Sequence, residues 1–239
     1  KLTQQIVSEK IGKVCFWNLD ARIKLLLVKT LGHTKVKFID VSPGDYLYDE
    51  LEDVAQFQEL VTFGREEYFT RINSLVLKYD GYRSDACKDK TVVIPNGICK
   101  TMKVKTDYHI GRNPRVVVSG RIAESKFIIE IIQAMNYVWH TIPTAELHLY
   151  GGAETYHHNY AKEVEVAAGK DAGRRIFFHG VEFDSRSHLP QYDVYVVLGK
   201  HQGCPNALME ALSVGMPSIA NDDGGTKEQL IHEKTGLLI

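Results

Sequence analysis

Short apolar runs alternate with amphipathic stretches along the chain, which is the pattern of an α/β protein. In the second half, every predicted strand ends in glycine or a small polar loop, as in a doubly wound sheet that binds a ligand at one edge. The predicted strands are Lys13–Trp17, Lys35–Val41, Ser74–Lys78, Thr91–Ile94, Arg115–Ser119, Glu146–Tyr150, Arg175–Phe178, Asp193–Leu198, Ser218–Ala220 and Gly236–Ile239. The predicted helices are Ala21–Leu31, two within Asp49–Asn73 broken near Gly64, Phe127–Trp139, Tyr156–Ala168, a short turn at Ser187–Tyr192, Ala207–Val214 and one opening at Thr226. Strands that alternate with helices in this way predict parallel sheets.

The chain divides where this alternation stops. Residues 99–113 are polar and irregular, and they predict an inter-domain linker, with a long surface loop inside one domain as the alternative. Residues 1–98 would then form a partial N-terminal α/β domain, and 114–239 a C-terminal Rossmann-like domain. The sequence begins at Lys1 rather than Met and ends within a predicted strand, so we expect a piece of a longer polypeptide.

Local signals set several helix ends. Asp20 is a good N-cap for the helix that follows it. Gly215 and Pro217 end the helix at Ala207–Val214 as C-terminal residues do. Thr226 and Gln229 have the spacing of a capping box.

Composition excludes several classes of function. The net charge is −1 and the pI about 6.9, so no long-range attraction draws the chain to nucleic acid. No apolar run approaches the roughly 20 residues of a membrane span, so we expect a cytoplasmic protein without a transmembrane segment, leaving peripheral association at a membrane surface open. The four cysteines lack CxxC spacing, and HExxH and Asp-x-Asp motifs are missing, so we expect no metal site.

Two cations in the stretch GRIAESK are the first candidates for chemistry. Arg121 and Lys126 follow a predicted strand and precede a helix. A planar guanidinium and a compact ammonium at the carboxyl end of a strand suit a diphosphate. The alternative is two solvated surface cations.

A second set of candidates lies in the stretch HQGCPNALMEALSVGMPSIANDDGGTKE. Glu210 is predicted in the first turn of a helix, where it would favour the helix dipole or accept from a ribose diol. Gly224 and Gly225 would let backbone approach a ligand closely, although ordinary turn chemistry explains any single glycine. Backbone amides at the helix starts suit an anionic ligand.

Together, GRIAESK, HGV, HQGCPNALMEALSVGMPSIANDDGGTKEQL and TGLL resemble the donor-binding domain of the group 1 glycosyltransferases (glycosyltransferase family 4, GT-B fold). The resemblance covers about Val92 to Ile239, and Ile94–Ile98 (IPNGI) is similar to the family's inter-domain linker. Residues 1–91 fit the acceptor domain only by the order of their elements. The resemblance implies two Rossmann-like domains, the first partial, and a retaining, metal-independent, hexosyltransferase-like transfer from a nucleotide diphosphate sugar. It requires no cofactor, and the acceptor would be a glycan, a lipid-linked molecule or another compound.

The resemblance also implies roles for particular residues. Arg121 and Lys126 would hold the diphosphate and neutralise charge on the leaving group, and Glu210 would bind the ribose. Val181 would lie near the base. The other donor-binding residues implied are Gly120, Gly203, Cys204, Pro205, Asn206, Gly224, Gly225 and Thr226.

Two departures from the family pattern leave alternatives open. The family's Glu-x7-Glu pattern appears here as Gln202 and Glu210, so one negative charge is lost beside an oxocarbenium-like sugar. The histidine often found in the family's first domain has no counterpart near Trp17 and Asn18. The alternatives are a catalytically inactive homologue that binds nucleotide sugar and a GT-B nucleotide-sugar 2-epimerase.

Overall fold

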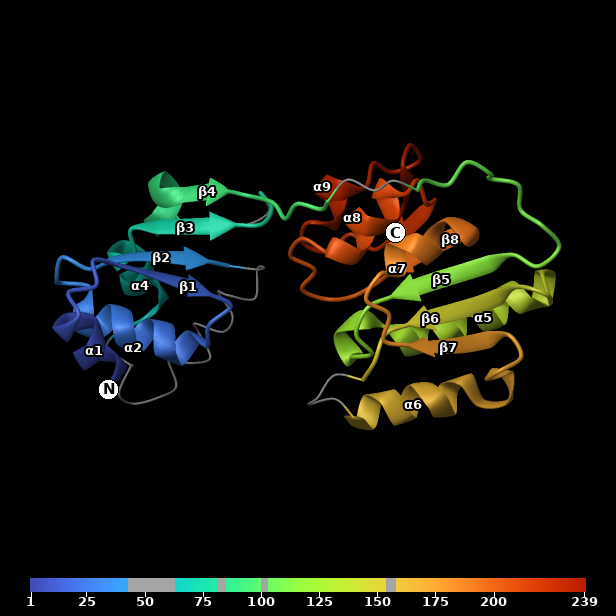
Figure 1. The fold of residues 1–239 in the computed structure, drawn as a ribbon, viewed down its shortest axis with the longest axis horizontal. Helices are drawn as coiled ribbons and strands as arrows, with labels where there is room; N and C mark the ends of the chain where they lie inside the picture. Colours follow the sequence, from blue (N-terminus) through green and yellow to red (C-terminus); the bar gives the residue numbers. More distant parts are fainter. Residues whose placement is uncertain (43–62, 81–84, 100–102, 154–157) are drawn as a thin grey trace. The chain divides into compact units, whose positions relative to one another are not determined.

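A computed structural model describes residues 1–42, 63–80, 85–99, 103–153 and 158–239. The chain forms two compact units, Lys1–Asn96 and Gly97–Ile239, each built on its own parallel sheet (Figure 1). This α/β architecture confirms the predicted fold class. The division falls after Asn96, two residues before the boundary predicted at 98.

In the described residues, the first unit holds a parallel four-stranded sheet with the order β1-β2-β3-β4. Asp20 caps α2 as predicted, because its carboxylate accepts from the backbone N–H of Arg22 at 2.9 Å. The strands are β1 (Lys13–Trp17), β2 (Lys37–Val41), β3 (Ser74–Leu77) and β4 (Thr91–Val93). The helices are α1 (Leu2–Ser8), α2 (Ala21–Leu31), α4 (Arg65–Arg71) and the 3-10 helix η1 (Asp85–Lys90).

A buried ionic group lies in the described core of this unit. Asp40 lies on β2 and faces α2 and α4, where Lys24 Nζ is 3.0 Å from its carboxylate and the Tyr68 hydroxyl donates to it at 2.5 Å. All three side chains are buried. Burial, together with the charge of Asp40, raises the pKa of Tyr68 well above its ordinary value. The group therefore ties the sheet to both helices.

The second unit holds a six-stranded parallel sheet in its described residues, with the order β10-β9-β8-β5-β6-β7. The strands are β5 (Arg115–Ser119), β6 (Glu146–Tyr150), β7 (Ile176–Gly180), β8 (Val194–Val197), β9 (Ser218–Ala220) and β10 (Gly236–Leu238). The α-helices are α5 (Ile128–Thr141), α6 (His158–Ala168), α7 (Ser185–His188), α8 (Asn206–Ser213) and α9 (Thr226–Gln229). The 3-10 helices are η2 (Glu124–Lys126), η3 (Gly169–Asp171) and η4 (Leu189–Gln191).

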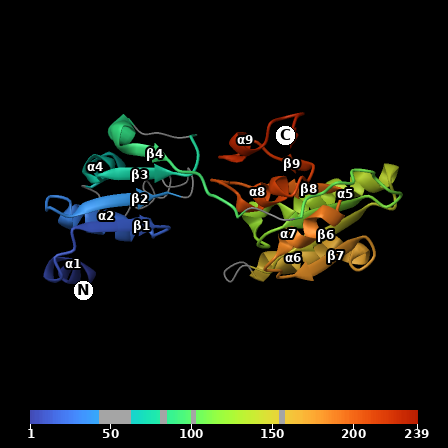
Figure 2. The same cartoon turned by 45° about the horizontal axis from the view of Figure 1, so that its top comes forward.

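Helices cover both faces of the second sheet (Figure 1, Figure 2). On one face α5 and α6 lie side by side and share a core with Leu147 and Leu149 of β6. On the other face α8, together with Leu230 directly after α9, shares a core with Tyr195 and Val197 of β8. The strand order reverses between the neighbouring strands β5 and β8: the chain continues from β5 to β6 on one side, and from β8 to β9 on the other. Ligands bind at such switch points in open α/β sheets.

One sequence prediction is wrong in detail, and two others fall outside the described residues. Thr226 is not the N-cap of α9, because Gly225 takes that position without a side-chain cap. The Thr226 hydroxyl instead donates to the backbone carbonyl of Asn221 at 2.6 Å. Residues 43–62 lie outside the described part, so the helix predicted before Gly64 is not described, nor is the predicted start of α6 at Tyr156.

The segment predicted as a linker hydrogen-bonds to the second unit. Lys105 Nζ donates to the carbonyl oxygens of Pro190 and Tyr192 at 3.3 and 2.7 Å, and its backbone N–H donates to Val214. The Tyr108 hydroxyl donates to the carbonyl of Gly215 at 3.1 Å. Residues 103–113 contain neither helix nor strand, yet these bonds fix 105–108 against the ends of η4 and α8.

Candidate functional site

Three loops meet at the carboxyl ends of β5, β8 and β9. The backbone N–H of Lys200 donates to the carbonyl of Ser125 at 3.0 Å, which joins the loop after β8 to the loop after β5. Asn221 accepts from Gly199 N–H at 2.9 Å and donates back to its carbonyl at 2.8 Å. Gly225 N–H donates to the carbonyl of Gln202 at 2.9 Å. These bonds hold the three loops together.

A first cavity of about 320 Å³ opens between the loops after β5 and β8. It brings together six of the residues predicted for the site: Gly120, Arg121, Lys126, Gln202, Pro205 and Asn206. Arg121 is exposed and Lys126 half-buried. The full lining is Val118, Ser119, Gly120, Arg121, Lys126, Ile128, Val197, Leu198, Gln202, Pro205, Asn206 and Ala207. The two predicted cations therefore lie on the same side of the sheet edge.

Lys126 and Gln202 are in direct contact. Lys126 Nζ donates to the side-chain oxygen of Gln202 at 2.8 Å, and the Gln202 amide nitrogen donates to the carbonyl of Lys200 at 3.1 Å. Gln202 is 4% exposed. The position where the family pattern has glutamate thus holds an ordered amide.

A second cavity of about 560 Å³ adjoins the first. The two share Ser119, Gly120, Arg121, Asn206 and Ala207, so Arg121 stands where they join. The second cavity is also lined by Tyr150, Gly151, Gly152, Ala153, Val181, Glu182 and Glu210. A long ligand could therefore extend through both cavities past Arg121.

Gly151 lets the loops after β5 and β6 approach each other closely beside the second cavity. A Cβ at Gly151, whose φ is +143°, would overlap the carbonyl oxygen of Gly120, so the loops after β5 and β6 can meet only if this residue is glycine. Gly151 and Gly152 were not among the predicted site residues. The signal was present, because a Gly-Gly pair directly follows the strand at the ligand edge.

Glu210 lies one turn further along its helix than predicted. Helix α8 begins at Asn206, and it has no acidic residue in its first turn. Glu210 is half-buried at the second cavity, and burial raises the pKa of its carboxyl above the ordinary value. Its position suits a hydrogen bond to a ligand hydroxyl better than a contact with the helix dipole.

Five predicted donor-binding residues do not line either cavity: Gly203, Cys204, Gly224, Gly225 and Thr226. Thr226 is fully buried, and Cys204 Sγ accepts from the side-chain nitrogen of Gln229 at 3.1 Å. Gly224 packs on the backbone of Gln202, whose carbonyl a Cβ there would overlap. These residues shape the loops, and their contact with a donor stays a prediction.

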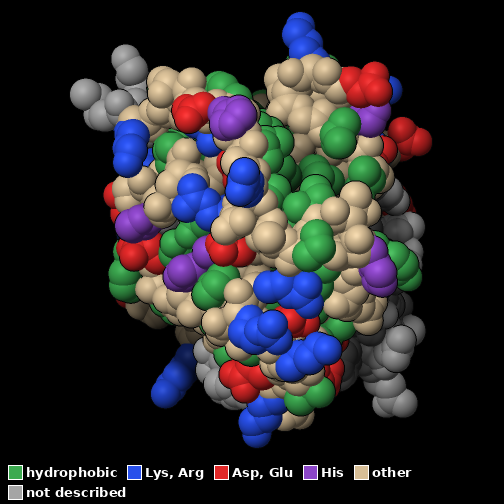
Figure 3. Space-filling model, turned by 90° about the vertical axis from the view of Figure 1, so that its right-hand side faces the viewer, with side chains coloured by type: hydrophobic (Ala, Val, Ile, Leu, Met, Phe, Trp, Pro, Cys, Tyr) green, Lys and Arg blue, Asp and Glu red, His purple; other side chains and the backbone are tan. Residues whose placement is uncertain are grey.

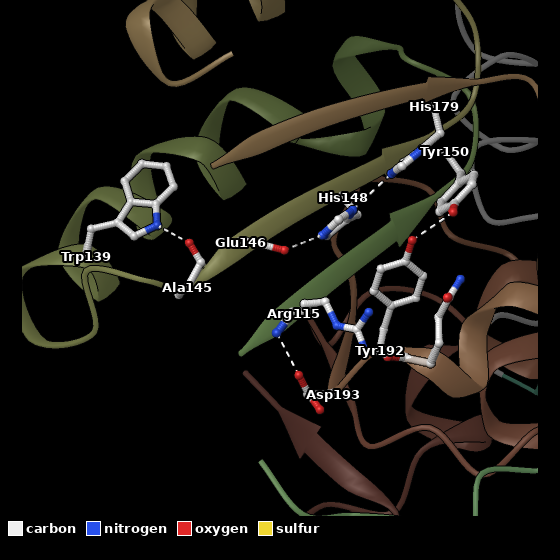
Figure 4. A network of polar contacts seen from close by, with 10 residues as sticks. Arg115, Trp139, Ala145, Glu146, His148, Tyr150, His179, Tyr192 and Asp193 are labelled. Carbon is white, nitrogen blue, oxygen red and sulfur yellow. Dashed lines mark hydrogen bonds and ion pairs between the residues drawn. The ribbon is translucent and has the colours of Figure 1, made fainter. Parts of the chain in front are cut away.

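A polar network supports the wall of the second cavity at Tyr150 (Figure 4). Glu146, His148 and Tyr150 alternate along β6 and share one face of the sheet, while Leu147 and Leu149 face the other core. The Tyr150 and Tyr192 hydroxyls are 2.7 Å apart. This alternation was visible in the sequence, but it predicted only a strand.

Two histidines continue the network away from the cavity. His148 Nδ1 and His179 Nε2 are 2.9 Å apart, and His148 Nε2 lies 3.1 Å from the Glu146 carboxylate. The His179 ring stacks on Tyr150 with centroids 4.3 Å apart. Burial lowers the pKa of both histidines. The electrostatic effect of the nearby His179 ring also lowers the pKa of His148. Both rings are therefore predominantly neutral at neutral pH.

Charges of both signs are interleaved on the face drawn in Figure 3. This mixture matches the net charge of −1. Among the described residues, no helix combines the length and apolar character needed to cross a membrane.

The chain resembles solved structures of one fold. S. aureus TarM, crystallised with Fondaparinux, alpha-GlcNAc-glycerol and UDP, aligns with a TM-score of 0.66 at 18% identity over 91% of this chain and 43% of TarM. Anabaena HepE with UDP and glucose aligns with a TM-score of 0.70 at 17% identity, over 100% and 67% of the two chains. Sucrose-phosphate synthase from Thermosynechococcus elongatus gives 0.70 at 18%, over 100% and 63%.

Sequence comparison identifies the family. The Vi polysaccharide biosynthesis protein VipC/TviE of Salmonella typhi is 34% identical over 65 residues, which are 27% of this chain and 11% of that protein. The chain thus spans a small part of this relative and less than half of TarM. The model of the family "Glycosyl transferases group 1" matches residues 113–239, more than half of the chain. The chain therefore belongs to the group 1 glycosyl transferases, and its fold is of the GT-B type.

Proposed function

We propose that this protein transfers a hexosyl group from a nucleoside diphosphate sugar to a glycan or a lipid-linked acceptor. The transfer would retain the anomeric configuration and use no metal ion. The observation that carries this proposal is the pair of adjoining cavities that share Arg121, with Lys126 in one and Glu210 in the other.

A nucleotide sugar has three parts in a fixed linear order, and the two cavities match that order. The larger cavity, with Tyr150, Val181 and Glu210, suits the nucleoside, and Glu210 would accept from the ribose diol. The diphosphate would lie at the junction beside Arg121. The glycosyl group would then enter the smaller cavity, beside Lys126 and Gln202.

The two cations give the site its chemistry. When the glycosidic bond breaks, negative charge develops on the leaving diphosphate. Arg121 and Lys126 would stabilise that charge in the transition state, as a bound metal ion does in other transferases. Lys126 is already oriented by Gln202, so little side-chain freedom is lost when the donor binds.

The comparisons support the ligand class. TarM and HepE were both crystallised with UDP, and VipC/TviE is named as a polysaccharide biosynthesis protein. We therefore place UDP first among the nucleotides, followed by GDP and ADP.

Calorimetric titration of UDP, GDP and ADP into the parent, Arg121→Ala and Lys126→Ala tests the proposal. Each cation would donate to a charged oxygen, so each variant should bind about tenfold to a hundredfold more weakly. Arg174→Ala and Lys227→Ala are matched controls, because both side chains are exposed and line neither cavity. Variants that bind as tightly as the parent would refute the assignment.

An inactive homologue is the second candidate, favoured by the neutral side chain at Gln202. It predicts that nucleoside diphosphate binds but that no product forms. An assay with a donor radiolabelled in its sugar, and with mixed glycan and lipid acceptors, separates the two candidates. Release of nucleoside diphosphate together with a labelled product supports transfer. Tight binding with no product from any donor supports the homologue.

A further inference from the structure

Lys126 contacts a neutral amide, that of Gln202, which the surrounding loops fix in place. The Gln202 backbone N–H donates to the Asp223 carboxylate at 2.6 Å, and its carbonyl accepts from Gly225 N–H at 2.9 Å. The side chain is 4% exposed. Gln202 therefore has little freedom to adopt another orientation.

Both ends of this amide have the partner that an amide requires. Its oxygen accepts from Lys126 Nζ at 2.8 Å, and its nitrogen donates to the Lys200 carbonyl at 3.1 Å. A carboxylate in the same place would set an acceptor oxygen against the acceptor oxygen of Lys200. The loop thus favours glutamine over glutamate at position 202.

Gly199 makes room for this arrangement. A Cβ at Gly199 would overlap the side-chain nitrogen of Gln202 and the carbonyl oxygen of Ser125. The loop after β8 is therefore shaped around the amide as well as bonded to it.

The neutral amide determines the charge of the smaller cavity. Among the described residues that line it, the ionisable ones are Arg121 and Lys126, and none is acidic. The larger cavity differs, because Glu182 and Glu210 line it together with Arg121. A glutamate at 202 would have placed an anion in the smaller cavity, beside the glycosyl group.

Resting on the function proposed above, we propose that the transferred sugar carries a carboxylate, as a glycuronosyl group does. Lys126 lines the smaller cavity and not the larger, so it stands on the glycosyl side of Arg121. There it can attract both the sugar carboxylate and the nearer phosphate. The amide at 202 holds the ammonium without repelling the carboxylate.

Pairs of donors that differ only at C6 test this inference: UDP-glucose with UDP-glucuronic acid, and GDP-mannose with GDP-mannuronic acid. In calorimetric titrations the parent should bind the carboxylated member of a pair at least tenfold more tightly. Gln202→Glu should remove that preference, since it adds a negative charge where the carboxylate would lie. Equal affinity for both members of each pair that binds, or preference for the neutral member, would overturn the inference.

Gln133→Glu is the matched control, because it makes the same chemical change at an exposed position of α5. It should keep the parent's preference. Gln202→Ala keeps the inference testable if Gln202→Glu fails to fold: removing the amide adds no negative charge, so the preference should persist at weaker overall binding. Loss of preference in Gln202→Ala would contradict a charge-based cause. A parent that binds neither UDP, GDP nor any of the four donors would refute the proposed function itself.

Discussion

The two units use a lysine in opposite ways. In the first unit Lys24 is 1% exposed and lies 3.0 Å from Asp40, in the core between a strand and two helices. In the second unit Lys126 lies at a cavity and donates to the neutral amide of Gln202 at 2.8 Å. A lysine sealed in a core needs an opposite charge, because an unpaired buried charge costs several kcal/mol. A lysine that lines a cavity keeps contact with solvent, so a neutral amide can orient it.

Lys24→Met breaks the sealed pair and should have the largest effect. It leaves the Asp40 carboxylate buried with only the Tyr68 hydroxyl, which should cost about 3–5 kcal/mol of unfolding free energy. Urea unfolding followed by circular dichroism measures it. Adding Asp40→Leu to this variant should recover much of the loss, since no charge then stays buried. A loss of unfolding free energy below about 1 kcal/mol in the single variant would show that solvent reaches the pair.

Gly199→Ala disturbs the oriented lysine through its partner. The new Cβ would collide with Gln202 and with the Ser125 backbone, which should cost about 1–3 kcal/mol. It should also weaken binding of UDP. Gly111→Ala is the control, because a Cβ there meets nothing within 4 Å. Equal unfolding midpoints for the two variants would contradict the packing described for Gln202.

Acidification should weaken the second unit through its histidine pair. The pKa of His148 and of His179 is lowered in the folded protein, so below the ordinary value of 6.5 the unfolded chain binds more protons. The unfolding free energy should therefore fall as pH decreases from 7 toward 5. Nearby Arg115 and His188 disfavour protonation, whereas Glu146 favours it on His148.

His148→Gln should flatten part of this pH dependence, because it removes one of the two groups that take up protons on unfolding. Thermal unfolding at pH 7, 6 and 5 measures the change. A parallel pH series on His140→Gln, which is exposed on α5, should follow the parent. Identical profiles for parent and His148→Gln would exclude this imidazole as a source of acid sensitivity.

Glu67→Gln should have the smallest effect. Glu67 and Arg71 form an i,i+4 ion pair on α4 at 2.6 Å, but their side chains are 46% and 33% exposed. Solvent screens such a pair, so its loss should cost about 0.3–0.5 kcal/mol. The comparison with Lys24→Met measures how much burial adds to the contribution of an ion pair. A cost of about 3 kcal/mol for Glu67→Gln would show that the exposed pair contributes as much as the buried one.

Much of the fold followed from local patterns. Strands such as Lys13–Trp17 and Arg115–Ser119 have the predicted bounds, since a short apolar run between turn residues has few alternatives. Asp20 caps its helix as expected. Thr226 was misassigned because its hydroxyl bonds Asn221, a partner from the preceding loop that a capping-box spacing does not reveal.

The site was less accessible to sequence reasoning. Arg121 and Lys126 could be placed at one edge because both lie in the loop that follows one strand. The choice between glutamine and glutamate at 202 depends on the Lys200 carbonyl, whose direction is set by the loop. Tyr150 and its contact with Tyr192 join positions 42 residues apart, which no local pattern specifies.

The bonds of Lys105 and Tyr108 have a practical consequence for isolating the second unit. A fragment that starts at residue 114, where regular structure begins, would lose both side chains and uncover the carbonyls of Pro190, Tyr192 and Gly215. A fragment that starts at residue 97 keeps them. We expect the longer fragment to express and refold with the higher yield, although it adds no helix or strand within residues 103–113.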